Sequence, residues 1–176
     1  DVEPLVKAVE QGAVLTSEME LFFELCPCKT YGITVSDGKT TTTTLTHKLL
    51  SAHYEGTDTK VWLGGNIGRP LIDILPEIKS SDAAVLELSS FQLMTMKKSP
   101  DVSVITNITP NHLDFHCSFE EYARVKLSLL DRADEKIINF DDVILRKYAK
   151  TAQIFGVTSA EQDFSTLKSL CKAENY

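Results

Sequence analysis

A run of five threonines follows a glycine and a lysine in the segment Asp37-Gly38-Lys39-Thr40-Thr41-Thr42-Thr43-Thr44. The residues before it have a strand-like pattern and those after it a helical one, so Gly38, Lys39 and Thr40 are expected at the start of a helix. Free N–H groups and the positive end of the helix dipole favour phosphate at such a position. The pattern predicts a phosphate site in which Lys39 reaches the terminal phosphates and the Thr40 hydroxyl binds Mg²⁺.

The spacing of this loop is irregular. The common phosphate-loop pattern has a glycine five residues before the glycine of Gly-Lys-Thr, but that residue is Ile33 and the nearest glycine is Gly32. A Gly-Lys-Thr sequence is a weak signal by itself. The phosphate-site interpretation therefore depends on residues further along the chain.

Two more polar residues follow segments that have the composition of buried strands. Glu87 ends the apolar segment that begins at Asp82, and Asn107 follows the segment 102–106. Ligands of open parallel sheets bind beyond the carboxyl ends of the strands, so Lys39, Glu87 and Asn107 are expected to meet at one edge. Glu87 is then a candidate ligand for Mg²⁺, and the alternative is a solvated residue at a strand end.

Other candidate residues lie after the second of these strands. Mg²⁺ prefers oxygen ligands, so the residues alone do not rank His112 above Asp114 as a metal ligand. His116 is interpreted as structural. Lys126 lies four residues after Tyr122 and shares a helix face with it, which by itself indicates a solvated helix lysine.

Strand-like and helix-like patterns alternate from about residue 30 to about residue 156, which predicts an α/β fold with a mostly parallel sheet and helices on both faces. Thr16 or Ser17 is the expected N-cap of a helix, and Ser118 with Glu121 has the spacing of a capping box. Strands are expected at 30–34, 60–63, 82–87, 102–106, 135–140 and 152–157. Helices are expected at 3–10 and 18–25, from residue 39, after residue 70, from 118 to about 130, and at 141–150.

Composition narrows the function class. The chain has 176 residues, of which 43% are hydrophobic and 24% charged, enough for one domain with a core. The net charge of -7 and the lack of a basic cluster argue against a nucleic-acid partner. The sequence has no membrane-length apolar run and no secretion signal, so a cytoplasmic protein is expected. We interpret the four cysteines as reduced and structural, with metal binding as second choice: Cys26, Cys28, Cys117 and Cys171.

Four motifs together resemble the central ATP-binding domain of the Mur ligase family, over about residues 10–157. In chain order these motifs are Asp37-Gly38-Lys39-Thr40-Thr41, Gly64-Gly65-Asn66-Ile67-Gly68, Glu87-Leu88-Ser89-Ser90-Phe91-Gln92-Leu93, and Thr106-Asn107 through His112-Leu113-Asp114. The third motif is most similar to the branch of the family that adds D-glutamate to UDP-N-acetylmuramoyl-L-alanine in peptidoglycan synthesis. The resemblance implies an ATP-dependent and Mg²⁺-dependent ligase of the P-loop type, with those two molecules as substrates.

The resemblance also implies roles for particular residues of this sequence. Lys39, His112 and Lys126 are the implied catalytic residues, and Ser89 and Ser90 are implied to shape the substrate site. The implied nucleotide-binding residues are Asp37, Gly38, Lys39, Thr40, Thr41 and Asn66. The implied metal-site residues are Thr40, Glu87, His112 and Lys126, the last as a lysine carbamylated by carbon dioxide. Burial near cations would lower the pKa of Lys126 and favour that modification.

The implied reaction has two steps. The substrate carboxylate attacks the γ-phosphate of ATP to give an acyl phosphate, and the amine of D-glutamate then displaces phosphate to form an amide. The expected organisation is a linker or remnant of an N-terminal domain at 1–28, the central domain at 29–158, and a tail at 159–176. The N-terminal and C-terminal domains of the family are not in this sequence.

The sequence differs from the family pattern at Val35, which occupies the place of the first glycine in the family's phosphate loop. A branched side chain there stands where the backbone approaches phosphate, and it resists a positive φ. Two alternatives therefore stay open. One is a degenerate or isolated nucleotide-binding domain without ligase activity, and the other is a small kinase or nucleotide hydrolase.

Overall fold

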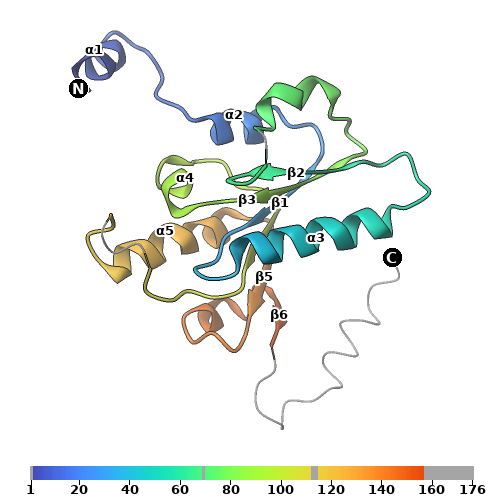
Figure 1. Ribbon diagram of the computed structural model, residues 1–176. Helices are drawn as coiled ribbons and strands as arrows, with labels where there is room; N and C mark the ends of the chain where they lie inside the picture. The colour runs from blue at the N-terminus through green and yellow to red at the C-terminus, as the bar shows by residue number, and fades with distance from the viewer. Residues whose placement is uncertain (1, 69, 112–114, 157–176) are drawn as a thin grey trace.

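The computed structural model describes residues 2–68, 70–111 and 115–156. Its centre is a six-stranded sheet with the strand order β2-β3-β1-β4-β5-β6, in which every neighbouring pair is parallel (Figure 1). The predicted α/β fold is confirmed. The strands are β1 (Lys29–Ile33), β2 (Val61–Gly65), β3 (Ala83–Glu87), β4 (Val102–Ile105), β5 (Glu135–Asn139) and β6 (Gln153–Phe155).

Helices cover both faces of the sheet. The helix α3 packs on one face, where Leu50 contacts a cluster that includes Ile33 and Val85. On the other face, two larger clusters join the sheet to α2, α4, α5 and two short 3-10 helices. The bounds are α1 (Glu3–Glu10), α2 (Glu18–Leu25), α3 (Lys39–His53), η1 (Ile72–Glu77), α4 (Ser90–Thr95), α5 (Phe119–Arg132) and η2 (Leu145–Tyr148).

Side-chain alternation along the central strand β3 decides which face its last residue reaches. Successive side chains of a strand point to opposite faces. Val85 packs in the cluster on the α3 face, whereas Ala84 and Leu86 pack in the cluster on the other face. Glu87, two residues after Val85, therefore points to the side of α3. This placement brings the Glu87 carboxylate to the first turn of α3, the helix that follows the phosphate loop.

Two serine caps define helix starts. The Ser17 side chain accepts a hydrogen bond from the Glu20 N–H at 3.2 Å, and Ser118 accepts one from the Glu121 N–H at 3.2 Å. The predicted capping box of α5 is wrong in its second half, because the Glu121 carboxylate accepts from the Cys117 N–H at 2.7 Å instead of from Ser118. Glu121 occupies N3, the position of the reciprocal bond in a capping box, but its carboxylate binds the N–H of the residue before the N-cap instead.

The predicted helix at 141–150 is wrong, since this segment holds only the 3-10 helix η2. The cause is Asp142, whose carboxylate accepts from the N–H groups of Ile144 and Leu145 at 2.8 and 3.1 Å and from the Ile108 N–H at 2.8 Å. Side-chain bonds of this kind compete with helical backbone bonds. The short helix predicted after Pro70 is also of the 3-10 type and contains Pro76.

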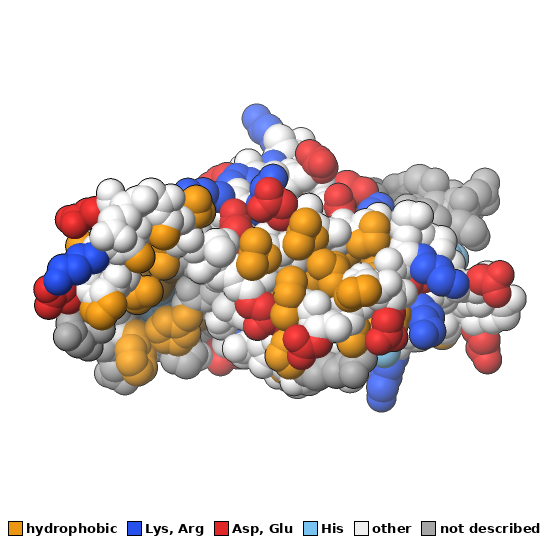
Figure 2. All heavy atoms as spheres, turned by 90° about the horizontal axis from the view of Figure 1, so that it is seen from above, with side chains coloured by type: hydrophobic (Ala, Val, Ile, Leu, Met, Phe, Trp, Pro, Cys, Tyr) orange, Lys and Arg blue, Asp and Glu red, His pale blue; other side chains and the backbone are white. Residues whose placement is uncertain are grey.

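The N-terminal segment contributes unequally to the core. In α1 no residue is buried, while Met19 and Phe22 of α2 are buried in the cluster on the face of α4 and α5. Figure 1 shows that α1 lies away from the sheet. In the view from above in Figure 2, apolar side chains gather between charged ones. Within the described ranges, no helix is long and apolar enough to cross a membrane.

Candidate active site

The phosphate loop ends at Gly38, where the backbone has a left-handed conformation that favours glycine. Gly38 is the N-cap of α3, with φ of 82°, and a Cβ added there would contact nothing within 4 Å. The left-handed backbone, and not lack of space, therefore favours glycine. No side chain caps the first turn of α3. Its N–H groups point out of the helix at the edge where the strands end, as an anion-binding helix start requires.

The threonines of α3 differ in their hydrogen bonds. The hydroxyls of Thr42, Thr43 and Thr46 donate to the carbonyl oxygens of residues 38, 39 and 42, each at 2.9 Å. These bonds to the preceding turn keep the three side chains on the helix. Thr40 differs, because its hydroxyl donates to the Glu87 carboxylate at 2.9 Å. Thr40 is thus the threonine that faces the strand ends.

Glu87 is buried and held from two sides. Its side chain is 2% exposed, and its second carboxylate oxygen accepts from the Asn66 side-chain amide at 2.9 Å. The Asn66 N–H also donates to the Glu87 carbonyl oxygen at 2.8 Å. Between them, Gly65 has φ of 89°, and a Cβ there would lie 2.2 Å from the Glu87 carbonyl oxygen. The close approach of the two strand ends therefore requires glycine at position 65.

Two lysines meet at one carbonyl. The ammonium groups of Lys39 and Lys126 lie 2.7 and 2.9 Å from the Val35 carbonyl oxygen, and Lys126 also donates to the Thr34 hydroxyl at 3.0 Å. Lys126 is 1% exposed and lies over the Tyr122 ring at 5.0 Å. Burial, and then the charge of Lys39, lowers the pKa of Lys126 to about 7. The reading of Lys126 as a solvated helix lysine is wrong.

The pKa of Lys39 is lowered as well, again by burial, while the nearby carboxylates of Glu87 and Asp37 act against the shift. Both lysines cannot keep a full charge at one carbonyl without a cost in free energy. Lys126, the more buried amine, is the one that loses its proton first. Near neutral pH, Lys126 is therefore neutral in part of the molecules.

Val35 is fully buried, and its side chain packs with Ile33, Val85, Val102 and Val104 on the α3 face. Its carbonyl oxygen points instead toward the two lysines. The branched side chain of Val35 therefore lies in the core. The restriction that a valine places on the backbone of the loop remains.

Asn107 clamps the loop and is the main residue whose role the sequence left open. Its side-chain oxygen accepts from the N–H groups of Ser36 and Asp37 at 3.1 and 3.0 Å, and its amide donates to the Asp37 carbonyl oxygen at 2.9 Å. Thr109 donates to the Asp37 carboxylate at 2.7 Å, and the Tyr122 hydroxyl donates to Ser36 at 3.0 Å. These bonds fix the shape of the loop from the β4 side.

Ser89 and Ser90 begin α4, two residues beyond Glu87. Ser89 closes a capping box with Gln92, so the sequence held the signal for this helix although we did not predict it. The Ser90 hydroxyl is hydrogen-bonded to His116 at 3.0 Å, and both side chains are buried. His116 also stacks on Phe91, with ring centroids 5.8 Å apart. Its burial agrees with a structural residue.

The structure brings Lys39, Thr40, Asn66, Glu87 and Lys126 together at the carboxyl edge of the sheet. Asp37, Gly38 and Thr41 are exposed on the loop and the first turn of α3. His112 and Asp114 lie outside the described residues. In the described ranges, no group of three histidine, cysteine, aspartate or glutamate side chains is arranged to hold a metal ion.

An all-parallel sheet with Gly-Lys-Thr at a helix start, and with a buried carboxylate of the neighbouring strand against that threonine, defines a nucleotide-binding domain of the phosphate-loop class. The model of the Mur ligase middle domain matches residues 33–174. The chain belongs to the Mur ligase family.

Curated relatives agree. The chain is 50% identical over 156 residues to UDP-N-acetylmuramoylalanine--D-glutamate ligase of Acetivibrio thermocellus, covering 87% of this chain and 33% of that protein. It is 51% identical over 151 residues to the enzyme of the same name from Ruminiclostridium cellulolyticum, covering 84% and 32%. For Clostridium acetobutylicum the identity is 51% over 147 residues, covering 82% and 31%. The chain thus spans about a third of the length of these relatives.

Proposed function

We propose that this chain is the ATP-binding part of a ligase that joins D-glutamate to UDP-N-acetylmuramoyl-L-alanine in peptidoglycan synthesis. The names of the relatives support the substrates, and the complete activity needs residues beyond the third of those proteins that the chain spans. One observation carries the proposal for the site. The Thr40 hydroxyl lies 2.9 Å from a buried Glu87 carboxylate, one residue after the lysine of the phosphate loop.

The residues fit a nucleoside triphosphate. The exposed, uncapped first turn of α3 offers N–H groups at residues 39–41, and the half-buried Lys39 supplies positive charge beside them. The Lys39 amine now rests on the Val35 carbonyl oxygen, and it would leave that acceptor for a phosphate oxygen. A charged acceptor forms the stronger hydrogen bond, which favours that exchange. Asp37, Gly38 and Thr41 frame the same position.

The residues also fit Mg²⁺. Thr40 and Glu87 place a hydroxyl and a carboxylate side by side, and such oxygen atoms are the ligands that Mg²⁺ takes together with phosphates and waters. Asn66 holds the carboxylate from its other side and fixes its orientation. We propose His112 as a further metal-site residue. A bound Mg²⁺ would neutralise the charge that spreads over the transferring phosphoryl group.

We propose that Lys126 is carbamylated. The modification requires a neutral amine that attacks carbon dioxide, forms an N–C bond and releases one proton to solvent. Burial supports this role, since it lowers the pKa of Lys126 to about 7 and so supplies the neutral form near neutral pH. The resulting carboxylate would replace a buried ammonium group, and it would lie close to the positive charge of Lys39.

Ser89 and Ser90 are proposed to shape the substrate site through their helix. Their hydroxyls are already engaged, one in the cap of α4 and the other with His116. They would therefore act by holding the start of α4 beside Glu87. The surface of α4 would then meet the substrate.

A second candidate is a nucleotide-binding domain without ligase activity, and Val35 is the observation that favours it. The valine restricts the loop that carries Lys39, although its side chain is buried. Membership of the Mur ligase family argues against the small kinase or nucleotide hydrolase.

We further propose that the chain is divided into a linker or domain remnant at 1–28, the central domain at 29–158 and a tail at 159–176. We also propose that the ligase acts in the cytoplasm, where ATP is available.

The test uses the full-length protein that contains this chain. It is incubated with ATP, Mg²⁺, UDP-N-acetylmuramoyl-L-alanine and D-glutamate, and ADP, phosphate and the amide product are quantified. The proposal expects equal amounts of the three products, formed only when both substrates are present and not when L-glutamate replaces D-glutamate. ATP hydrolysis independent of the substrates, or no product in either the native protein or Val35→Gly, would overturn it.

A further inference from the structure

A pair of cysteines lies far from the phosphate loop, at the amino edge of the sheet. Cys26 and Cys28 flank Pro27 in the turn between α2 and β1, and both are free thiols with their sulfur atoms 3.5 Å apart. Cys26 is half-buried, whereas Cys28 is 6% exposed and packs with Met19 and Phe22. The proposed ligase reaction uses neither residue.

The backbone of the turn forces the two sulfur atoms together. The Cys26 N–H closes α2 by donating to the Phe22 carbonyl oxygen at 2.8 Å, and Cys26 itself is extended, with φ of −65° and ψ of 122°. Pro27 cannot continue a helix and keeps the residue before it extended. In an extended segment, residues i and i+2 point to the same side. The pairing is thus built into the turn.

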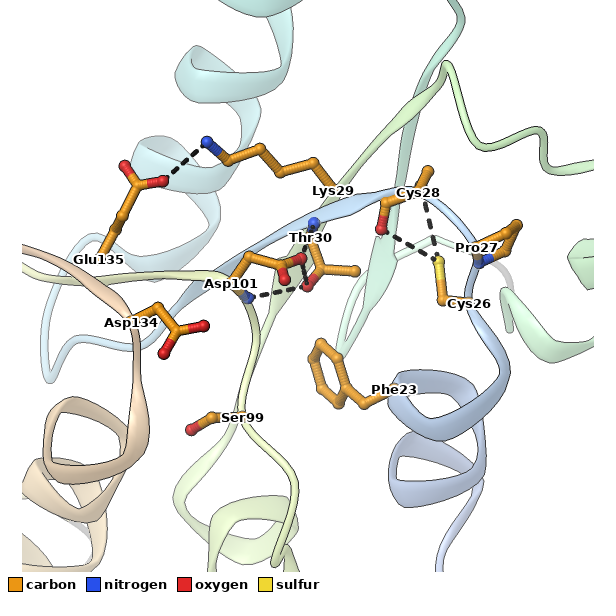
Figure 3. A pocket seen from close by; sticks show the side chains of 10 residues that line it. All are labelled: Phe23, Cys26, Pro27, Cys28, Lys29, Thr30, Ser99, Asp101, Asp134 and Glu135. Atoms are coloured by element: carbon orange, nitrogen blue, oxygen red, sulfur yellow. Dashed lines mark hydrogen bonds and ion pairs between the residues drawn. The ribbon is translucent and has the colours of Figure 1, made fainter.

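Cys26, Pro27 and Cys28 line one side of a cavity of about 430 Å³ (Figure 3). Its opposite wall is polar: Lys29 pairs with Glu135 at 2.8 Å. Asp101 lines the cavity too, with its carboxylate held by the backbone N–H and hydroxyl of residue 30, both at 2.7 Å. A hollow of this size accommodates a small peptide-like molecule.

The two thiols differ in acidity. The two sulfur atoms share a hydrogen bond in which either can be the donor, and this bond lowers the pKa of Cys26 to about 7. The same bond, together with burial, raises the pKa of Cys28. A thiolate is the attacking species in disulfide exchange, and an attacking thiol is most effective when its pKa is near the ambient pH. Cys26, the more exposed of the two residues, is therefore the attacking residue, and the buried Cys28 is the second, resolving residue.

We propose that Cys26 and Cys28 form a reversible dithiol–disulfide site that is oxidised by a small disulfide of the glutathione class. The Cys26 thiolate attacks one sulfur of the oxidant, which forms a mixed disulfide and releases one thiolate. Cys28 then gives its proton to the released thiolate and attacks the Cys26 sulfur, which releases the second half of the oxidant as a thiolate. Two electrons pass to the oxidant. The sulfur atoms close from 3.5 Å to a bond of about 2.05 Å.

The test uses the intact protein with Cys117→Ser and Cys171→Ser, kept with a metal chelator in buffers of varied reduced-to-oxidised glutathione ratio. Free thiols are alkylated and the protein is digested with trypsin, which leaves both cysteines in one peptide, residues 8–29. The expected result is a peptide that loses two hydrogen atoms and accepts no alkylating group, and that recovers both thiols in reduced glutathione. Two free thiols at the most oxidising ratio, or a mixed disulfide that never closes, would overturn the proposal.

Single variants assign the order of attack. Cys28→Ser should keep glutathione bound at Cys26, while Cys26→Ser should leave Cys28 unmodified at the same ratio. Equal glutathione incorporation in both variants would contradict the assignment. Because either variant can affect folding, circular dichroism accompanies each measurement. The rate of alkylation by iodoacetamide at pH 7 in the native sequence gives an independent readout, and modification of Cys26 at least about tenfold faster than Cys28 is expected.

Discussion

The Thr40 hydroxyl donates a 2.9 Å hydrogen bond to the carboxylate of Glu87, which joins the first turn of α3 to the end of the central strand β3. The two residues are 47 positions apart in the chain. They meet because β3 pairs with β1 in parallel, with Glu87 level with Ile33 at the strand ends. The relationship gives the phosphate loop an acidic partner on the face of the sheet that α3 covers.

Glu87→Gln should weaken the Mg²⁺-dependent part of ATP binding by at least about tenfold, because it removes the negative charge beside Thr40 while keeping the size of the side chain. Calorimetric titration with ATP, with and without Mg²⁺, measures the effect. Glu77→Gln, at an exposed glutamate of η1, is the matched control and should leave binding unchanged. Equal losses with and without Mg²⁺ would contradict a metal role for Glu87.

Gly65→Ala should destabilise the protein by about 4 kcal/mol or more, because the new Cβ would lie 2.2 Å from a backbone oxygen at a positive φ. Gly56→Ala separates the two causes, since Gly56 has φ of 82° but no atom within 4 Å of the added Cβ. This control should cost about 1 kcal/mol. Denaturant unfolding measures both values, and similar losses would show that the contact with Glu87 is unimportant.

Lys126 should make stability depend on pH. Its pKa falls from the ordinary 10.5 in the unfolded chain to about 7 in the folded protein. Between pH 7 and 10.5 the unfolded chain therefore binds more protons, so the contribution of this residue to stability rises with pH across that window, by up to about 1.4 kcal/mol per pH unit. Below pH 7 the buried ammonium group lowers the free energy of unfolding by its full amount.

Lys126→Met should accordingly be most favourable, relative to the native protein, below pH 7, and this advantage should shrink as the pH rises toward 10. Free energies of unfolding in carbonate-free buffers at several pH values give the comparison. Lys48→Met, at an exposed lysine of α3, is the control and should show a constant difference. A constant difference for Lys126→Met as well would refute the lowered pKa.

Carbamylation can be observed separately. With ¹³C-labelled bicarbonate, the native protein should give a carbamate signal in carbon NMR that grows as the pH rises through about 7, because the neutral amine is the reactive form. Lys126→Arg should lose the signal, and Lys48→Arg should keep it. A signal that persists in Lys126→Arg would assign the modification to another amine.

Val35→Gly should have opposite effects on stability and on ATP binding. Removal of a fully buried side chain costs about 3 kcal/mol of unfolding free energy, while release of the restricted backbone strengthens ATP binding by about fivefold. Val35→Ala is the control, because it removes the branch of the side chain but keeps a Cβ, which resists a positive φ. It should be destabilised without tighter binding, and equal binding in all three proteins would show that Val35 does not limit the loop.

Much of the fold was readable in the sequence. The bounds of α1 and α2 and the start of α3 agree with prediction, because amphipathic patterns, the Ser17 cap and the glycine before Lys39 are local signals. The segment 141–150 failed for a non-local reason, since Asp142 bonds to the backbone of Ile108, 34 positions away. A pattern within one segment does not contain such a partner.

The sequence predicted which residues lie at the strand ends of the site, but not the contacts between them. Glu87 and Asn107 could be placed at the edge of Lys39 because parallel strands end together. The clamp that Asn107 forms on Ser36 and Asp37 required coordinates. The burial of Lys126 did too, because its acceptors lie more than 90 positions away on the loop after β1.

The most direct measurement is a crystal structure of the protein with Mg²⁺ and a non-hydrolysable ATP analogue. We expect the phosphates to lie against the N–H groups of residues 39–41, with the Lys39 amine moved from the Val35 carbonyl to a phosphate oxygen. The metal ion should be ligated by Thr40 beside Glu87. A nucleotide bound elsewhere, such as in the cavity beside Cys26, or a metal ion with no contact to either residue, would contradict it.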